Sequence, residues 1–354
     1  YLFLLNMNSI AIFLGLLIFS FIVTSVAIVP FINLLYKLRF QRQKQANTTD
    51  VFGVQTSVFN KFHSGKVGTP IGGGLLIVVI VSLVFAAIIP LLQLSGIQVT
   101  SVYSQHQVEI NLIFFSFLSF SILGLYDDIK KFFGFHQSGF FGLSLKVKLL
   151  IQIILALIIA LSMYWQLGIS ILYIPFLGTL QLGWWYVPFA VLVIVSFANA
   201  VNITDGLDGL ASGLLMISLF GLWVLSTSIL DVPLSVFLAL WIGALVSFLY
   251  FNVYPARIML GDVGSLSFGA TLAVVGLLLG KTPALLVIGF IFVFEVLTSL
   301  LQLLSKKFFG KKLFLAAPFH LTLQAYGWEE PKIVQRAWLV QIMLTLFGMW
   351  IAVI

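Results

Sequence analysis

The sequence contains no cysteine and very little charge. Of its 354 residues 8% are charged, against about a quarter in an average soluble domain. The absence of cysteine excludes disulfides, thiolate metal sites and a cysteine nucleophile. Apolar side chains, by contrast, make up 61% of the residues. A soluble fold of this length could not bury so many, so the surplus must face lipid, which solvates hydrocarbon without the cost that water imposes.

Ten apolar runs follow one another along the chain. Most are about 17 to 25 residues long, enough for a helix rising about 1.5 Å per residue to cross a hydrocarbon core of about 30 Å. The eighth run is short, and a tilt or a break is expected there. Because no repeat or second domain is evident, residues 1–354 are predicted to form a single all-α, polytopic membrane domain. The predicted spans are Ile10–Tyr36, Ile71–Ser95, Ile110–Tyr126, Leu149–Gly168, Trp184–Val201, Leu210–Leu230, Leu234–Phe251, Leu266–Gly280, Pro283–Leu304 and Ile333–Ile354.

The basic residues predict which way the spans run. Seventeen of the eighteen lysines and arginines fall in or beside loops one, three, seven and nine, counted from the N-terminus. Since short cytoplasmic loops carry excess positive charge, these loops are predicted to be cytoplasmic and both chain ends extracytoplasmic. Uncharged loop four, residues 170–183, predicts a small extracytoplasmic hairpin around Gly178 and Thr179. The net charge of +7 is spread over short loops, which indicates membrane topology and no nucleic-acid partner.

Carboxylates gather on the same predicted face. Eight of the eleven acidic residues fall in the odd-numbered loops or at the adjoining helix ends. A transporter is expected to place its charges near the membrane midplane, in broken helices. The observed placement therefore favours chemistry at the cytoplasmic rim of the bundle. The eight residues are Asp50, Asp127, Asp128, Asp205, Asp208, Asp262, Glu329 and Glu330.

The third span ends in LGLYDDIKK, which contains the adjacent residues Asp127 and Asp128. Their carboxylates repel each other and face the negative end of the helix dipole, so a cation must compensate them. Lys130 and Lys131 could do so while serving only as topology signals. A divalent metal or a phosphate-bearing ligand is the other interpretation, and this segment alone leaves both open.

Loop five reads ANAVNITDGLDGLASG and contains Asn202, Asp205 and Asp208 at intervals of three residues. On a helix these side chains would share one face. The alternative is ordinary helix capping by Thr204 and Asp205, which leaves Asp208 and the glycines unexplained.

Loop seven, FNVYPARIMLGDVGSLSFG, places Asp262 between small residues, close to Asn252 and Arg257. Small residues let backbone amides approach an anion, or leave room for a metal. A tight turn ending in a Ser265 cap is the structural alternative.

Loops one and nine are weaker signals. In loop one, NKFHSGKVGTPIGGG offers Lys61, His63, Lys66 and Thr69 before a glycine run. It is similar to a phosphate-cradling loop without matching GxxxxGK[ST], and its glycines could equally serve helix packing. In loop nine, SKKFFGKKLFLAAPFH ends in His320, and its lysines would attract anionic headgroups as readily as a substrate.

One acidic residue, Glu295, lies near the middle of the ninth predicted span. A carboxylate there is costly unless it is neutral or paired, so it is either structural or functional. Gln302 follows two helical turns later on the same face.

Four polar clusters, from loops one, three, five and seven, are thus predicted to meet at one face of one bundle. Hard oxygen ligands without cysteine favour Mg²⁺ or Mn²⁺, and lysines beside glycines favour phosphate. A diphosphate substrate with a lipid supplied by the bilayer would account for both.

The chain also resembles the phospho-N-acetylmuramoyl-pentapeptide transferases, within the superfamily of polyprenyl-phosphate N-acetylhexosamine 1-phosphate transferases. The resemblance spans nearly the whole chain, and several strings in the family's order are far more specific than any one. They are KVGTPIGGG, LGLYDDIKK, NAVNITDGLDGLA, FNVYPARIMLGDVGS, FEVLTSLLQ, APFH and GWEEPKIVQRAW.

This resemblance implies transfer of phospho-N-acetylmuramoyl-pentapeptide from UDP-MurNAc-pentapeptide to undecaprenyl phosphate at the inner face of the cytoplasmic membrane. The products would be UMP and lipid I, a peptidoglycan precursor. It further implies a homodimer, a Mg²⁺ cofactor held by Asp262, and Asp127 and Asp128 as the catalytic acidic pair. The implied substrate-binding residues are Lys66, Thr69, Lys131, Lys148, Asn202, Asp205, Asp208, Asn252, Met259, Gln302 and His320.

Two segments depart from the family pattern. Where the family reads three histidines followed by Tyr and Glu, this chain reads HLTLQ, which keeps His320 and places Gln324 where Glu is usual. At the position where the family has an aromatic residue, expected to stack on uracil, this chain has Met259. The first alternative is therefore a related transferase that passes N-acetylglucosamine 1-phosphate to a polyprenyl phosphate, although GWEEPKIVQRAW favours the muramoyl branch. The second alternative is a transporter or flippase, which Glu295 in mid-span supports.

Overall fold

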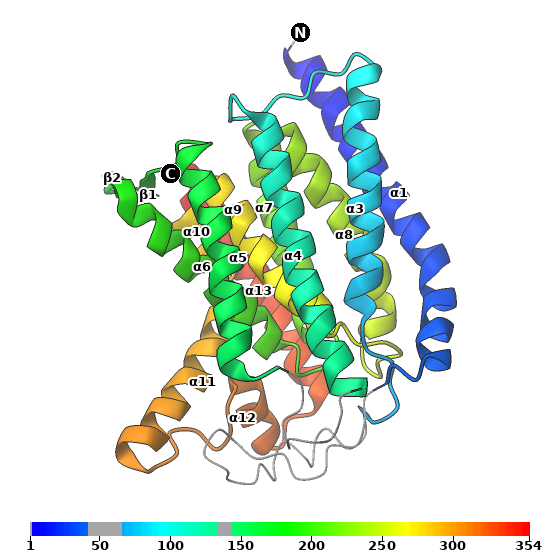
Figure 1. Cartoon of the computed structure of the whole chain (residues 1–354), viewed down its shortest axis with the longest axis vertical. Coiled ribbons are helices and arrows are strands. Elements are labelled where there is room, and N and C mark those ends of the chain that lie inside the picture. Colours follow the sequence, from blue (N-terminus) through cyan, green and yellow to red (C-terminus); the bar gives the residue numbers. More distant parts are fainter. Residues whose placement is uncertain (1, 42–65, 134–142) are drawn as a thin grey trace.

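The computed structural model describes residues 2–41, 66–133 and 143–354, which form a bundle of helices with one short hairpin (Figure 1). Long apolar runs give the helices, two of which contain an interior proline, Pro30 or Pro90, and glycine-rich or charged segments separate them. A short 3₁₀ helix, Gly183–Trp185, leads into α6. The α-helices are α1 Leu2–Lys37, α3 Gly73–Leu94, α4 His106–Phe133, α5 Leu145–Trp165, α6 Tyr186–Thr204, α7 Leu210–Ser228, α8 Val232–Asn252, α9 Asp262–Leu278, α10 Thr282–Ile288, α11 Phe290–Phe309, α12 Phe319–Ala325 and α13 Glu330–Val353.

Eight helices in the described ranges are long and apolar enough to cross a membrane, and α10 with α11 would make a ninth, bent by 76°. The chain is therefore a multi-pass membrane protein, as predicted. Helix α9, of 17 residues, is shorter but unbroken, so the expected irregularity lies in the ninth run instead of the eighth. The bend falls at Gly289, where a Cβ atom would overlap the Phe197 ring. Close packing at a helix-weakening residue thus accounts for the break.

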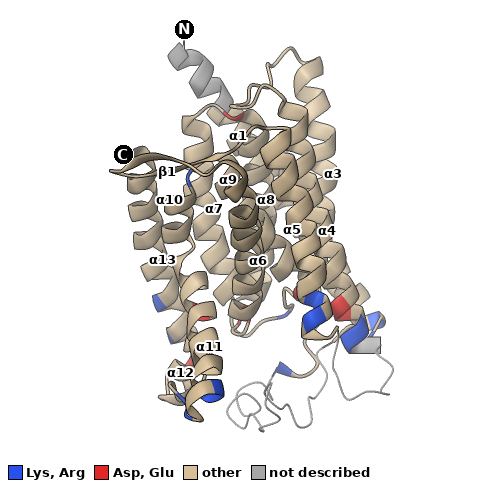
Figure 2. Ribbon diagram, turned by 60° about the vertical axis from the view of Figure 1, so that its left-hand side comes forward, with Lys and Arg blue, Asp and Glu red and all other residues tan. Residues whose placement is uncertain are grey.

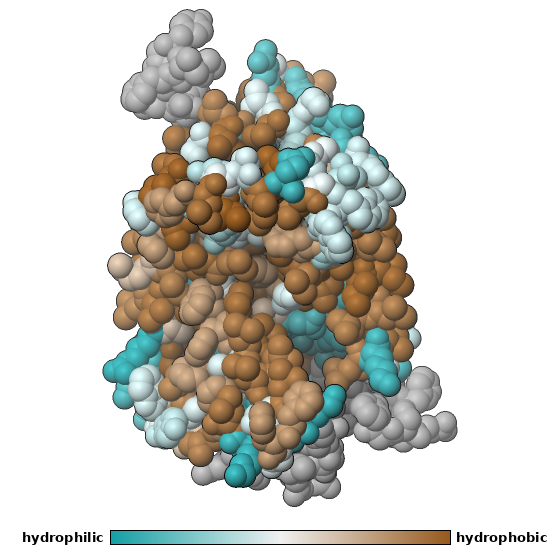
Figure 3. Space-filling view, turned by 90° about the vertical axis from the view of Figure 1, so that its left-hand side faces the viewer, coloured by the Kyte–Doolittle hydropathy of each residue, from teal (hydrophilic) through white to brown (hydrophobic). Residues whose placement is uncertain are grey.

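Burial is uneven across the bundle. In the most apolar stretch of α8, 89% of residues are buried, against 28% in α1, 28% in α5 and 22% in α13. Every residue of α9 after Asp262 is buried as well. The outer helices expose mainly apolar side chains, and a broad hydrophobic surface separates the more polar ends (Figure 3). Helices α8 and α9 therefore form the centre, and the outer helices face lipid.

A β-hairpin joins α5 to α6, formed by β1 (Ile171–Ile174) and β2 (Gly178–Gln181). Since Ile174 pairs with Gly178, the chain reverses over residues 175–177, directly before Gly178 and Thr179, around which the hairpin was predicted. Phe176 makes this reversal in a left-handed conformation, with φ of 68°. The hairpin, the beginning of α1 and the C-terminus lie at the same end of the bundle (Figure 1). Their extracytoplasmic location remains a prediction.

Charged side chains concentrate at the opposite end, where α12 lies (Figure 2). We call it the charged end. At this end α4 packs closely on α9. The packing is so tight that a Cβ atom on Gly124 would overlap the Asp262 backbone carbonyl. Small residues permit such close approach between membrane helices. The contact brings Asp127 and Asp128, one turn beyond Gly124, next to the first turn of α9.

We predict that Gly124→Ala forces α4 away from α9. Overpacking of this kind costs about 1–3 kcal/mol, so the thermal unfolding midpoint in detergent, followed by tryptophan fluorescence, should fall. Gly15→Ala on α1 is the matched control, since no atom lies within 4 Å of a Cβ at that position. Equal midpoints for the two variants would contradict the packing argument.

Candidate active site

Three aspartates and two lysines meet at the charged end, contributed by three helices. We call Asp127, Asp128, Asp262, Lys131 and Lys148 the acid–lysine cluster. Helix α4 supplies two of the carboxylates and Lys131, α5 supplies Lys148, and α9 supplies Asp262. Both aspartates of α4 are 2% exposed. Carboxylates this deeply buried are tolerated only when they are paired and hydrogen-bonded.

The carboxylate of Asp262 is the centre of this cluster. Its Oδ2 lies 2.5 Å from the Lys148 ammonium and 2.8 Å from that of Lys131, and its Oδ1 accepts a 3.1 Å hydrogen bond from Asn202 Nδ2. Asp262 is the first residue of α9, after Gly261, whose φ of 80° suits glycine. A carboxylate at a helix N-terminus is also favoured by the helix dipole. The Asn202 amide additionally donates to the Ser265 hydroxyl at 2.8 Å.

Asp127 and Asp128 point to different partners. Asp127 accepts the Leu143 backbone N–H at 2.6 Å and lies 3.0 Å from the Lys148 ammonium and 3.2 Å from that of Lys131. Asp128 accepts the Val263 backbone N–H at 3.0 Å, which ties α4 to the first turn of α9. Lysines therefore compensate the acidic pair, but Lys148 from another helix joins Lys131 in doing so.

The oxygen ligands of the cluster fit a magnesium ion whose remaining ligands come from the substrate. Mg²⁺ is usually bound by one or two carboxylates together with phosphate oxygens and water, and not by a cage of protein ligands. Asp262, Asp127 and Asp128 offer carboxylate oxygens of this kind in one place. Within the described ranges, no group of three or more His, Cys, Asp or Glu residues could hold a metal unaided. The arrangement is thus suited to a metal that arrives with a phosphate ligand.

A second buried ion cluster joins three distant parts of the chain. The Lys66 ammonium lies 2.7 Å from Asp208 Oδ1 and 2.5 Å from Glu330 Oε1, and it donates to the Gly206 carbonyl at 3.3 Å. Glu330 Oε1 also accepts the Asp208 backbone N–H, and Asp208 Oδ2 accepts the Ala256 backbone N–H at 3.0 Å. We call Lys66, Asp208 and Glu330 the Lys66 cluster. It fastens the start of α13 to the loop between α6 and α7.

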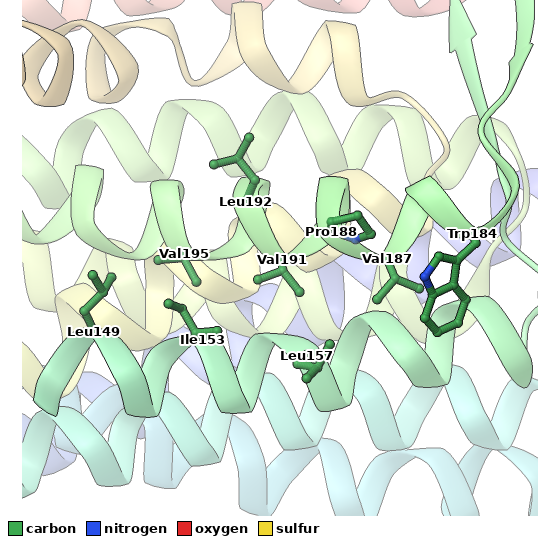
Figure 4. Close-up of a pocket in the computed structure, with 9 residues that line it drawn as sticks. All are labelled: Leu149, Ile153, Leu157, Trp184, Val187, Pro188, Val191, Leu192 and Val195. Carbon is green, nitrogen blue, oxygen red and sulfur yellow. The ribbon is translucent and has the colours of Figure 1, made fainter. Parts of the chain in front are cut away.

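An apolar groove runs along α5 and α6 from a point beside the acid–lysine cluster. Its volume is about 580 Å³. One end is at Leu149, the residue after Lys148, and the other is at Trp184 near the hairpin (Figure 4). Among the described residues, those that line it are all uncharged. The lining residues are Leu149, Ile153, Leu157, Trp184, Val187, Pro188, Val191, Leu192 and Val195.

Comparison with known proteins decides the family. The model of glycosyl transferase family 4 matches residues 110–280. A phospho-N-acetylmuramoyl-pentapeptide-transferase of Aquifex aeolicus is 39% identical over 305 residues, covering 81% of this chain and 80% of its own. Proteins of the same name from Clostridium perfringens (35% identical, 90% of each chain) and Desulfotalea psychrophila (42% identical, 65% of this chain and 69% of its own) are also similar. The chain belongs to the phospho-N-acetylmuramoyl-pentapeptide-transferase family. The resemblance inferred from the sequence motifs is thereby confirmed.

Loop five does not form the continuous helix that would place its three polar residues on one face. Helix α6 ends at Thr204, whose hydroxyl donates back to the Ala200 carbonyl, and α7 begins only at Leu210. Gly206 and Gly209 interrupt the helix, and Gly209 has φ of 78°. Asn202 consequently reaches Asp262, whereas Asp208 reaches Lys66. Thr204 is not an N-cap, and Asp205 follows the end of α6.

The other predicted substrate-binding residues lie at or near this end with different surroundings. Asn252 is buried, accepts from the Ser212 hydroxyl at 2.5 Å and donates to the Ile258 carbonyl at 2.9 Å. Thr69 is half-buried, and Met259 is buried. Gln302 holds the segment after α11, since its amide bonds with the backbone of Leu313 and Phe314. Asp50, Lys61 and His63 lie outside the described residues.

His320 and Glu295 contact each other. His320 Nδ1 lies 3.1 Å from Glu295 Oε2, and the His320 backbone N–H donates to both carboxylate oxygens, at 3.2 and 3.3 Å. Glu295 lies on α11, beyond the bend, and contacts α12 at the charged end (Figure 2), so its predicted place in the middle of a continuous span is wrong.

Sequence reasoning missed Glu330 as a member of a buried cluster. The sequence places it among the rim carboxylates without indicating a partner, because a contact between residues 264 positions apart leaves no local signal. The only hint is its place at the start of the last apolar run. Ser265, expected as a turn cap, instead accepts from Asn202.

Two acidic residues lie away from the charged end. Glu109 and Asp231 are 0% and 1% exposed. Asp231 caps α8 by accepting the Leu234 backbone N–H, and it also accepts that of Val102. Burial raises the pKa of the Asp231 carboxyl above its usual range, and burial likewise raises the pKa of the nearby Tyr103 phenol. These residues hold the segment before α4 to the turn before α8.

We predict that Lys66→Met destabilises the protein, because it leaves Asp208 and Glu330 buried without their cation. Breaking a buried ion pair from one side costs about 3–5 kcal/mol. The unfolding midpoint in detergent should therefore fall well below that of Lys130→Met, whose side chain is exposed. If the two midpoints coincide, the Lys66 cluster does not stabilise this end of the fold.

Proposed function

We propose that this chain transfers phospho-N-acetylmuramoyl-pentapeptide from UDP-MurNAc-pentapeptide to undecaprenyl phosphate, giving lipid I and UMP with Mg²⁺ as cofactor. The observation that carries the proposal is the acid–lysine cluster, which three helices assemble at one end of a membrane bundle. The names of the relatives and their similarity over most of the chain support it. The proposal places the cluster at the cytoplasmic face of the cell membrane and includes a homodimer.

The apolar groove supports a lipid acceptor. An isoprenoid chain requires an apolar surface, and a phosphate requires cations, so an acceptor of this type needs both side by side. The groove begins at Leu149, and Lys148 precedes that residue at the centre of the cluster. A chain lying along α5 and α6 would hold its phosphate within reach of Asp262 and its lysines.

The proposed reaction needs no strong general base. The attacking group is a phosphate monoester whose second pKa is near 6, so it is largely dianionic at about pH 7. The protein must instead bring two anionic groups together and offset the charge that develops between them. Lys131 and Lys148 already lie within 2.8 Å of one carboxylate and are held in place for this task.

Each side chain of the cluster then has a defined part. Asp262, oriented by Asn202, would hold the magnesium ion, which would supply positive charge to offset the charge of the phosphates when bound. Lys131 and Lys148 bind the non-bridging oxygens and offset developing charge. Asp127 and Asp128 position these lysines and the first turn of α9, and can accept a residual proton. Lys66 is engaged by two carboxylates, so we assign it to the support of loop five.

We expect Asp262→Asn to abolish turnover while the protein stays folded. The change keeps the size of the side chain and removes the charge that the mechanism requires, and losses of about a hundredfold or more are usual for such groups. Asp231→Asn makes the same chemical change at the opposite end and should leave UMP release within about threefold of the wild type. Retained activity in Asp262→Asn would eliminate the assignment.

The identity of the sugar-nucleotide donor is tested with detergent-purified protein, undecaprenyl phosphate and Mg²⁺. UDP-MurNAc-pentapeptide and UDP-GlcNAc are supplied in parallel reactions, and UMP release is measured. We expect UMP from the muramoyl donor only, and none when a chelator removes the metal. UMP from UDP-GlcNAc alone would favour the related transferase, with His320-Leu321-Thr322 and Met259 as its distinguishing positions. Release from neither donor would reopen the transporter alternative.

A further inference from the structure

Among the described residues, the buried carboxylate of Glu295 forms hydrogen bonds only with His320. It is 4% exposed, and within the parts of the chain that the structure describes no lysine or arginine forms an ion pair with it. Both of its oxygens accept the His320 backbone N–H, and Oε2 lies 3.1 Å from His320 Nδ1. A buried carboxylate is costly unless hydrogen bonds or a counter-charge compensate it. These hydrogen bonds all serve to orient one imidazole.

This contact fixes which ring nitrogen faces Glu295. Both carboxylate oxygens already accept the His320 backbone N–H, so we assign Glu295 the acceptor role toward the ring as well and place the shared proton on Nδ1. The backbone bond to the same carboxylate holds the residue as well as its ring. The imidazole therefore has a defined rotation and tautomer, and Nε2 is directed away from Glu295.

The other ring nitrogen lies against loop five. A Cβ atom on Gly206 would overlap His320 Nε2, so the glycine is needed for the imidazole to approach this loop. Gly206 lies between Asp205 and Asp208, and its carbonyl accepts from Lys66. In the described ranges Nε2 has no hydrogen-bond partner from the protein. It is therefore placed to bind a polar group of a substrate that lies over loop five.

We propose that Glu295 is a positioning residue, which holds His320 with Nδ1 protonated so that Nε2 binds the sugar-nucleotide donor beside loop five. This inference rests on the proposed function, because it assigns His320 to that donor. The neighbouring residues make the imidazole unusually important here. Leu321 has no polar side chain, and the Thr322 hydroxyl donates to the Ala316 carbonyl, so neither can replace it.

Three variants test the hydrogen bond itself. Glu295→Met keeps an unbranched side chain but has no strong acceptor, and the change is compatible with a membrane interior. Glu295→Gln keeps an oxygen for Nδ1–H and the backbone N–H. We expect Glu295→Met to lower kcat/KM for the donor by about 10- to 100-fold, the range seen when orienting partners of histidine are removed. Glu295→Gln should stay within about fivefold of the wild type. Ser299→Ala, which removes a hydroxyl bonded to the Glu295 backbone carbonyl, is the control and should stay within about twofold.

A double-mutant cycle shows whether the effect passes through His320. In the His320→Ala background, Glu295→Met should change kcat/KM by less than about threefold, because the group that it positions is gone. The proposal is overturned if Glu295→Met is fully active, if Glu295→Gln is as inactive as Glu295→Met, or if the full loss persists in the His320→Ala background.

A second readout does not depend on turnover. The chain has four histidines, so ¹⁵N-histidine NMR can assign His320 as the signal absent from His320→Ala. The wild type should show Nδ1 protonated, and Glu295→Met should shift this signal toward the other tautomer. An unchanged tautomer overturns the positioning role. If the wild type transfers neither donor, the proposed function fails, and the NMR result alone decides whether Glu295 sets the tautomer.

Discussion

The structure depends on the compensation of buried negative charge by lysine within an apolar bundle. Asp127, Asp128 and Asp262 lie close together at the end of three helices that are otherwise apolar, and unpaired they would repel one another and disrupt the packing of α4 on α9. Lys131 and Lys148 remove that repulsion. The same ammonium groups are what an incoming diphosphate needs, so the interaction that stabilises the free protein also prepares it for an anionic substrate.

Much of the architecture follows from the sequence, because the membrane imposes a simple rule. A run of about twenty apolar residues must form a helix, since lipid offers no partner for the backbone. The ten runs are all helical. Asp127 and Asp128 gather around Asp262, whereas Asp208 and Glu330 join Lys66 in a second cluster. The family motifs, which occur in the family's order along the chain, indicate the reaction that composition alone left open. The structure places Asp127, Asp128, Lys131, Lys148 and Asn202 around Asp262, and their roles stay predictions.

What could not be predicted depends on contacts between distant residues or on glycine geometry. Glu330 joins Lys66 and Asp208 across more than a hundred residues, and no local pattern records this. Gly206 and Gly209 end a helix that the spacing of polar residues in loop five had suggested. Gly289 bends the ninth run because the Phe197 ring requires its space. Each difference arises where tertiary packing overrides a local preference.

In the proposed mechanism the donor diphosphate and its metal bind at Asp262 between Lys131 and Lys148. An experimental structure with Mn²⁺ and UDP-MurNAc-pentapeptide tests it most directly, because the metal can be located by anomalous scattering. We expect a peak about 2 Å from an Asp262 carboxylate oxygen, with the diphosphate bridging to both lysines. A metal and diphosphate bound elsewhere, with the acid–lysine cluster unchanged, would contradict it.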